Sequence, residues 1–184
     1  MTNNFKQIGE YIDSLNCDND TFFHISIISR LKDNRKQLLD KVIYDTYITS
    51  SRELYNQETT ITKVCDSLNA RAYISLIPLS MQKYTDNLKH LYYNKSLQNL
   101  RQSIKNAMIK SNKNDDVLLL VDIDAHQLED MDGIRELLKD NIIIEVPSRT
   151  GLHFVCNKFN VTEFHRHYPR IVVKTNGMTI LYAY

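Results

Sequence analysis

An unbroken apolar run near the middle of the chain constrains its fold more than any other feature. Residues 117–124 read VLLLVDID, so a run of aliphatic side chains ends in two aspartates. A short run of this kind leaves no polar side for water, and it predicts a fully buried strand. Because alternate side chains of a strand share one face, we expect Asp122 and Asp124 to point the same way.

Two carboxylates this close repel each other unless a positive group lies between them. A divalent cation held by hard oxygen ligands is the usual solution, and it makes Asp122 and Asp124 candidate metal ligands. The alternative is an ordinary strand end, in which Asp122 closes the strand and Asp124 caps the following helix. The motif Asp-x-Asp is compatible with both interpretations.

Length and cysteine content limit the class of protein. A chain of 184 residues fits one domain, 1–184, which can divide into two lobes, 1–113 and 114–184. Its three cysteines are widely spaced and form no Cys-x-x-Cys pair, which argues against a disulfide framework and against structural zinc. No apolar leader or membrane-spanning segment is evident, so we expect a cytoplasmic protein without a membrane partner.

Charge is distributed unevenly, although the formal net charge is only +1. Lysines and arginines dominate residues 81–113, whereas aspartates and glutamates dominate residues 115–145. A basic segment beside an acidic strand end would suit a polyanion and its metal ions. The alternative is that each segment is only the solvated face of a helix.

The order of expected elements mixes strands with helices. Apolar runs and alternation predict strands at 23–27, 42–48, 71–79, 117–121, 142–146 and 152–155. Apolar residues recur at helical spacing in five places, which predicts helices there. They are the N-terminus, the residues after Ser50, the residues after 80, and the segments near 134–138 and 162–167. A last hairpin, 171–174 with 178–182, is expected to turn at Asn176-Gly177. This order indicates an α+β fold with mixed sheets rather than a regular parallel winding.

A second polar element lies in the hairpin predicted at 142–155. Its turn reads PSRTG and precedes His153, which projects to the side opposite its apolar neighbours. Gly151 would let the backbone approach a ligand or adopt positive φ. Donors suited to phosphate oxygens come from Ser148, Arg149 and Thr150. A single histidine on a strand is, however, more often a structural residue.

Together the two elements resemble the catalytic core of the archaeo-eukaryotic primase (primase-polymerase) superfamily. In that family one strand ends in paired acids, here Asp122 and Asp124, and a later Ser-x-His-like turn and strand matches Ser148 to His153. The resemblance extends to the order of elements, with an N-terminal strand-and-helix unit before an RRM-like half that carries the motifs. It therefore implies a mixed-sheet primase-polymerase-like core.

The resemblance implies a nucleotidyltransferase that adds nucleotides on a nucleic-acid template during replication or repair of DNA. Asp122 and Asp124 would hold Mg²⁺ or Mn²⁺, and together with His153 they would form the catalytic set. The nucleotide triphosphate would be bound by Ser148, Arg149, Thr150 and His153. Implied partners are a DNA or RNA strand and a helicase or other replication protein. From charge alone, Arg71 and Lys83 are placed along the nucleic acid.

The chain departs from the family pattern where a third acid is expected. That strand reads IVVKTNG at 171–177, and neither Lys174 nor Asn176 can bridge two divalent ions as a carboxylate does. Glu145 is a possible substitute. Two interpretations therefore stand beside polymerase activity. One is a degenerate module that binds nucleotide or single-stranded nucleic acid, and the other is a metal-dependent phosphodiesterase or nuclease that uses the two aspartates with His126 or His153.

Overall fold

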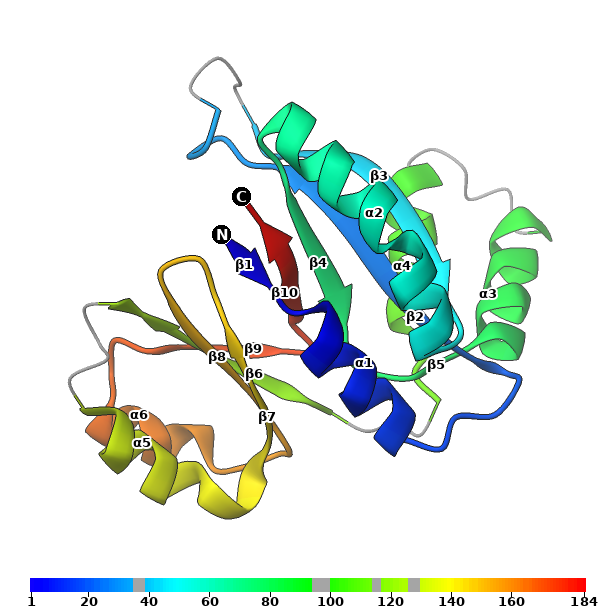
Figure 1. Cartoon of the computed structure of the whole chain (residues 1–184). Coiled ribbons are helices and arrows are strands. Elements are labelled where there is room, and N and C mark those ends of the chain that lie inside the picture. The colour runs from blue at the N-terminus through cyan, green and yellow to red at the C-terminus, as the bar shows by residue number, and fades with distance from the viewer. Residues whose placement is uncertain (35–38, 94–99, 114–116, 126–129) are drawn as a thin grey trace.

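Two antiparallel sheets and the helices packed on them make up the protein (Figure 1). The computed structural model describes residues 1–34, 39–93, 100–113, 117–125 and 130–184. Six α-helices lie in these ranges, so the predicted α+β class is confirmed. The expected mixed sheets are not found, because every pairing between the described strands is antiparallel. Among the described helices, none is both long enough and apolar enough to cross a membrane.

The first sheet has the strand order β1-β10-β4-β2-β3, and a short strand, β5, also pairs with β2. It joins the two ends of the chain, because β10 lies between β1 and β4. Its strands are β1 (Thr2–Asn3), β2 (Thr21–Ser29), β3 (Lys41–Ile48), β4 (Arg71–Ser75), β5 (Leu79–Ser80) and β10 (Met178–Ala183). The strand predicted at 71–79 is therefore two strands, β4 and β5, separated by residues 76–78.

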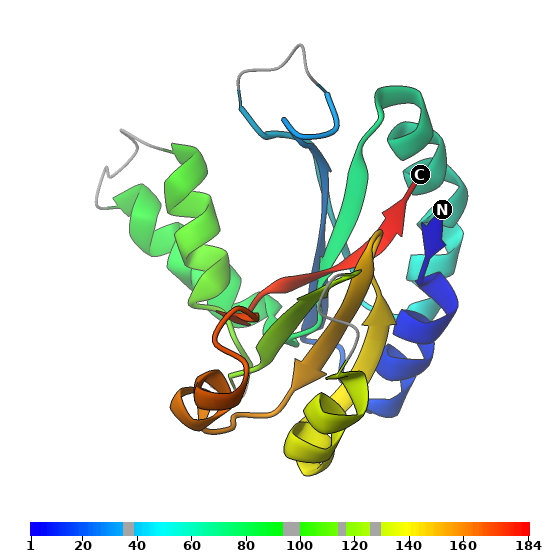
Figure 2. The same cartoon turned by 90° about the vertical axis from the view of Figure 1, so that its left-hand side faces the viewer.

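Helices cover both faces of the first sheet (Figure 2). On one face, α1 (Phe5–Ser14) and α2 (Ser51–Leu68) bury a core that includes Phe5, Ile25 and Ile74. On the other, α3 (Met81–Tyr93) and α4 (Leu100–Ile109) pack near Phe22 and Leu79. This double cover explains why β2 is buried along nearly its whole length, rather than on one face as its alternating sequence predicts.

Helix α2 begins and ends where its sequence predicts. The hydroxyl of Ser50 accepts a hydrogen bond from the amide of Glu53, and the Glu53 carboxylate accepts one from the amide of Thr49. These two contacts satisfy amides that have no partner within the helix. At the other end Asn69 adopts the left-handed conformation with φ 45°, which ends the helix.

The second sheet has the order β7-β8-β6-β9, with every neighbouring pair antiparallel. Its strands are β6 (Leu119–Asp124), β7 (Ile142–Pro147), β8 (Gly151–Cys156) and β9 (Val172–Thr175). With α5 (Met131–Leu138) and α6 (Val161–His167), the chain runs β-α-β-β-α-β, an arrangement known from ferredoxin-like folds. Both helices lie on one face, over Val121, Ile123 and Phe154.

The other face of the second sheet packs toward the first sheet, since Leu120 and Val155 belong to the core beneath α1 and α2. β6 is thus buried on both sides, as its unbroken apolar sequence predicts. The hairpin of β7 and β8 is also confirmed.

The hairpin predicted at Asn176-Gly177 is wrong, because β9 and β10 belong to different sheets. A tight type I′ turn requires positive φ at both central residues, and here only Asn176 has it, at 51°. The Asn176 side chain instead accepts a hydrogen bond from the amide of Leu118, next to β6. The division at residue 114 consequently marks where the second sheet begins but not where it ends, because β10 returns to the first sheet.

Candidate functional site

The register between β6 and β8 brings Asp122 and His153 together. The two residues face each other directly across the strands, and His153 Nε2 lies 3.2 Å from Asp122 Oδ1. The other ring nitrogen, Nδ1, lies 3.0 Å from Thr179 Oγ1 on β10. His153 is therefore buried between the sheets, on the face of the second sheet that also carries Asp122.

Lys174 occupies the strand in which the resemblance would place a third acid. Its Nζ lies 2.6 Å from Asp122 Oδ2, so the two carboxylate oxygens of Asp122 contact two different basic side chains. The pKa of Asp122 lies far below its ordinary value, because hydrogen bonds from His153 and Lys174 outweigh the opposing effect of burial. The carboxylate is thus ionised and balanced by protein groups.

The group formed by Asp122, His153 and Lys174 does not fit a site in which carboxylates bridge two divalent ions. Within the ranges described above, no three histidine, cysteine, aspartate or glutamate side chains are grouped as a metal site. Glu145 cannot serve as the substitute acid in this arrangement, because Arg135 on α5 holds both of its oxygens at 3.1 and 2.9 Å. The metal ligands Asp122 and Asp124 therefore stay a prediction, and His126 lies outside the described residues.

Asp124 ends β6 opposite Gly151 and is exposed. A Cβ atom at Gly151 would lie 1.9 Å from the carbonyl oxygen of Ile123, so glycine is required there. The close approach that we expected at Gly151 is thus to the backbone of β6, not to a ligand, and its φ is not positive.

The turn between β7 and β8 is fixed by the N-terminus of the chain. The side chains of Thr2 and Asn4 donate hydrogen bonds to the carbonyl oxygens of Ser148 and Pro147, at 3.3 and 2.8 Å. Thr150 is exposed at the tip of the turn. The side chains of Thr2 and Asn4 therefore help to set the position from which Arg149 reaches the first sheet.

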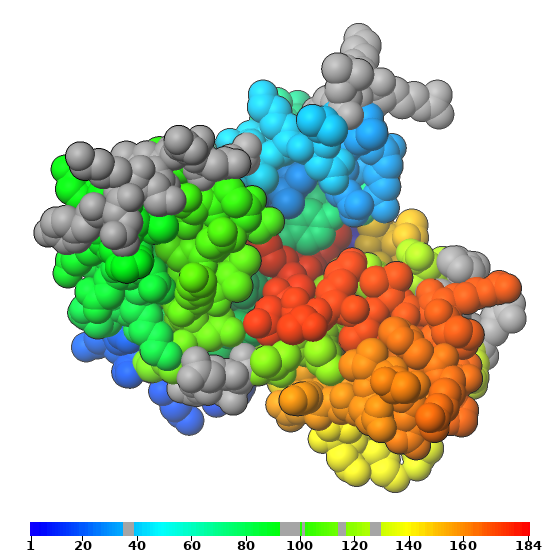
Figure 3. All heavy atoms as spheres, turned by 180° about the vertical axis from the view of Figure 1, so that it is seen from behind, coloured from blue at the N-terminus to red at the C-terminus, as the bar shows by residue number. Residues whose placement is uncertain are grey.

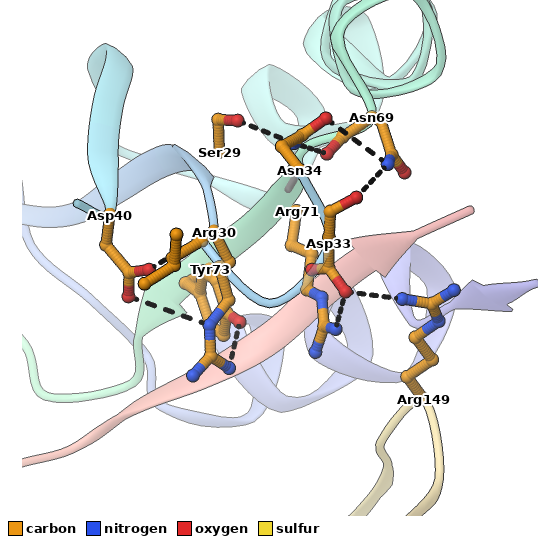
Figure 4. Close-up of polar contacts among 10 residues, drawn as sticks. Ser29, Arg30, Asp33, Asn34, Asp40, Asn69, Arg71, Tyr73 and Arg149 are labelled. Atoms are coloured by element: carbon orange, nitrogen blue, oxygen red, sulfur yellow. Dashed lines mark hydrogen bonds and ion pairs between the residues drawn. The ribbon is translucent and has the colours of Figure 1, made fainter. Parts of the chain in front are cut away.

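Arg149 and Arg71 meet at Asp33, in the turn after β2 (Figure 4). Asp33 Oδ1 accepts hydrogen bonds from Arg71 Nη2 at 2.6 Å and from Arg149 Nη1 at 2.7 Å. The Asp33 side chain is only 6% exposed and that of Arg71 10%, whereas Arg149 is 43% exposed. Burial raises the pKa of Asp33, but the two arginines and Lys32 outweigh it and lower that pKa.

Polar side chains hold the turn that carries Asp33. Asn34 donates to Ser29 Oγ at 2.8 Å and to the carbonyl oxygen of Asn69 at 2.9 Å, and Asn69 donates back to the carbonyl oxygen of Asp33 at 2.7 Å (Figure 4). Arg30, at the start of the turn, lies 3.3 Å from the hydroxyl of Tyr73. The left-handed end of α2 thus positions the carboxylate.

Lys32 interacts electrostatically with charged residues of both sheets. Desolvation and the charges of Arg30 and Arg71 lower the pKa of Lys32, while Asp33 and Asp124 oppose that change. We call Arg30, Lys32, Arg71 and Arg149 the junction cations, because they gather where the two sheets meet.

Lys83, the other residue placed along nucleic acid, lies elsewhere. Its Nζ donates hydrogen bonds to the carbonyl oxygens of Asn112 and Lys113, at 2.8 and 3.1 Å, and so ties α3 to the segment after α4. The structure therefore does not bring Lys83 to the junction cations, whereas it does bring Arg71 there.

Two cavities lie elsewhere on the molecule, and neither is lined by the residues of the predicted site or by the junction cations. One, of about 480 Å³, is an apolar groove between α4 and the first sheet, lined by Ser26, Tyr47, Met108 and Met178 among others. Figure 3 shows it as a recess between α4 and β10. The other, of about 900 Å³, lies at the opposite end of β6, near Tyr11 and Leu118.

No pattern in the sequence predicts the roles of Asp33, Lys32 and Thr179. The segment KDNRK at 32–36 predicts only a turn. The one feature of this segment that could have indicated a site is its aspartate, which stands among lysines and an arginine. Thr179 carries no motif at all, since its role depends on β10 lying in the first sheet. Comparisons with protein-family models, with curated proteins and with solved structures found no match to this chain.

Proposed function

We propose that the junction cations bind the phosphate groups of a nucleotide or of single-stranded nucleic acid, without metal-dependent nucleotide addition. Phosphate binding is supported by the gathering of Arg71 and Arg149 on one carboxylate oxygen of Asp33. The ion pair between Lys174 and Asp122, at 2.6 Å, argues against nucleotide addition. A lysine in that place neutralises the carboxylate that a polymerase would use for its metal ions. In this proposal a primase-polymerase-like scaffold would carry an ion-paired centre in place of a metal centre.

The junction cations support binding of an anion. Guanidinium groups bind phosphate oxygens through paired hydrogen bonds, and Arg149 keeps much of its side chain in solvent. The cations come from the turn after β2, from β4 and from the β7–β8 turn, so one ligand could contact both sheets. With a net charge of only +1, such binding would rest on this local group rather than on the whole surface.

The primase-polymerase-like core belongs to the same proposal. Its RRM-like half is supported by the β-α-β-β-α-β order of the second sheet, with Asp122 on the first strand and His153 on the third. A helicase or other replication protein as partner remains a prediction from the resemblance, and a cytoplasmic location remains a prediction from the sequence.

Nucleotidyltransfer is the second candidate function, favoured by one observation. Asp122 and Asp124 alternate along β6, and His153 lies directly beside the first of them. If Lys174 moved aside, Asp122 and Asp124 would be the residues to hold Mg²⁺ or Mn²⁺, and Ser148, Arg149, Thr150 and His153 those to bind the triphosphate. A metal-dependent nuclease would use the same aspartates, and no described feature favours it over the transferase.

Fluorescence anisotropy with a labelled single-stranded oligonucleotide in EDTA tests the proposal. We expect binding that weakens steeply as salt rises, and Arg149→Gln should reduce the salt slope by about one. Arg135→Gln is the matched control, because Arg135 is a similarly exposed arginine, 45% against 43%, paired with Glu145. No binding at low salt would overturn the proposal, and manganese-dependent primer extension abolished by Asp122→Ala would replace it with the second candidate.

A further inference from the structure

We infer that Arg71 and Arg149 form a site for a single phosphate group, and that the Asp33 carboxylate occupies this site until a phosphate replaces it. The inference rests on the proposed function and deepens it, because it states where one phosphate binds and what competes with it. Its starting point is the contact of one carboxylate oxygen with two arginines from different sheets.

The contact leaves hydrogen-bonding capacity unused in a buried place. Only Oδ1 of Asp33 accepts from the arginines, and the other oxygen, Oδ2, is buried without a hydrogen-bond partner among the described residues. Nε of Arg71 is likewise buried and has no partner there. Buried polar atoms are nearly always hydrogen-bonded, so two such atoms on adjacent side chains mark an incomplete match.

A phosphate group matches the two arginines better than the carboxylate does. Each guanidinium has five donors in a planar fork, and two of them together exceed what one carboxylate oxygen can accept. Phosphate presents more acceptor oxygens and carries more negative charge than a carboxylate. It can therefore accept paired hydrogen bonds from both arginines at once.

The turn that carries Asp33 can release the carboxylate without disrupting a strand. Asp33 lies beyond the end of β2, and the turn is held by hydrogen bonds of Asn34 and Asn69 that lie at the surface. Exchange of such bonds with water costs little free energy, because a hydrogen bond to solvent replaces each hydrogen bond to the protein. Arg71 and Arg149, by contrast, are fixed by β4 and by the β7–β8 turn.

The competing explanation is a purely structural ion pair that fastens the two sheets. Both explanations predict that loss of Asp33 lowers stability. Only competition predicts that loss of the Asp33 charge strengthens the binding of phosphate, so the sign of the change in affinity separates them.

Calorimetric titration with inorganic tripolyphosphate in EDTA tests the inference. We expect Asp33→Asn to tighten binding about tenfold, because the neutral amide competes less for the arginines, and Arg149→Gln to weaken it about tenfold. Asp132→Asn and Arg135→Gln are the matched controls, since they remove the same charges from α5, and both should leave the affinity unchanged. Equal or weaker binding by Asp33→Asn would overturn the inference.

Hydrogen exchange of the native protein gives a second readout that does not depend on folding of the variant. The amides of Asp33 and Asn34 donate to the carbonyl oxygen of Arg30. Saturating tripolyphosphate should accelerate their exchange, because departure of Asp33 opens the turn. Slower or unchanged exchange in the ligand-bound protein would contradict displacement of the carboxylate.

The two proposals can fail separately. If the oligonucleotide binds with the expected salt dependence but Asp33→Asn does not tighten tripolyphosphate binding, the phosphate site is wrong and the proposed function stands. If neither the oligonucleotide nor tripolyphosphate binds at low salt, both are wrong.

Discussion

Two carboxylates in this protein each contact two basic side chains, but they are assembled in different ways. Asp122 lies on β6, with His153 on the adjacent strand β8 and Lys174 on the adjacent strand β9, so the register of one sheet creates the group. Asp33 lies in a turn of the first sheet and contacts Arg71 in β4 and Arg149 in the β7–β8 turn, so the packing of two sheets creates the other.

The two groups also differ in how completely their atoms are paired. Both oxygens of Asp122 have basic partners, whereas one oxygen of Asp33 has none within the described residues. A fully paired carboxylate is a poor place for a new ligand, because binding must first break existing contacts. The incompletely paired group is the better candidate for exchange with an incoming anion.

The largest effect is expected when the Asp33 carboxylate is removed. Asp33→Ala leaves Arg71 buried without its counter-charge, and we expect the free energy of unfolding to fall by about 3 kcal/mol. Urea denaturation measures the change. Asp132→Ala removes an exposed aspartate and should leave the midpoint unchanged; a similar midpoint for both variants would show that the Asp33 contact contributes little.

Substitution of His153 should have the next largest effect. His153→Ala removes a buried ring that contacts Asp122 and Thr179, and we expect a loss of about 2 kcal/mol in the free energy of unfolding. Thr179→Val removes only the hydroxyl partner and should cost about 1 kcal/mol. If the two variants lose the same amount, the contact between His153 and Asp122 does not stabilise the fold.

Lys174 provides a test of whether the ion pair excludes metal. Lys174→Met frees Asp122 Oδ2, and we expect manganese affinity, followed by electron paramagnetic resonance, to rise about tenfold. Lys139→Met is the control, because Lys139 is an exposed lysine paired with Glu136 at 2.8 Å. An unchanged affinity would mean that Lys174 does not block a metal site at Asp122.

The smallest expected effect is a change in how the stability of the folded protein depends on pH. The pKa of Asp122 is lower in the folded protein than its ordinary value of 3.8, so its ionised form adds stability above about pH 4, and this stability is lost as pH falls further. Asp122→Asn should therefore be less stable than the wild type by about 1 kcal/mol at pH 7, and the difference should shrink below pH 4. A difference independent of pH would refute the assigned ion pairing.

The first group could be predicted only in part from the sequence, and the second could not. Alternation along VLLLVDID places Asp122 and Asp124 on one face, because strand geometry determines it. The pairing of β6 with β8, which brings His153 beside Asp122, was expected only from the resemblance. Lys174 was noted only as a residue that cannot replace an acid. Its contact with Asp122 requires that β9 pair with β6, which no local pattern in the sequence specifies.

Asp33 was missed because its partners lie far away in the sequence. Arg71 and Arg149 were each expected to contact nucleic acid or nucleotide, but nothing in a single sequence shows that a turn at residue 33 reaches both. The Asn176-Gly177 hairpin failed for a related reason. A local turn signal was overridden when β10 paired with β4 and β1, which buries Ile180 and Leu181 in the first sheet.

The most direct test of the account follows the arginine side chains themselves by nuclear magnetic resonance. During titration with a single-stranded oligonucleotide in EDTA, we predict saturable shifts of the Nε resonances of Arg71 and Arg149, while that of Arg135 stays in place. Shifts of Arg135 equal to those of the other two, or no shift of any of them at low salt, would contradict phosphate binding at the junction of the two sheets.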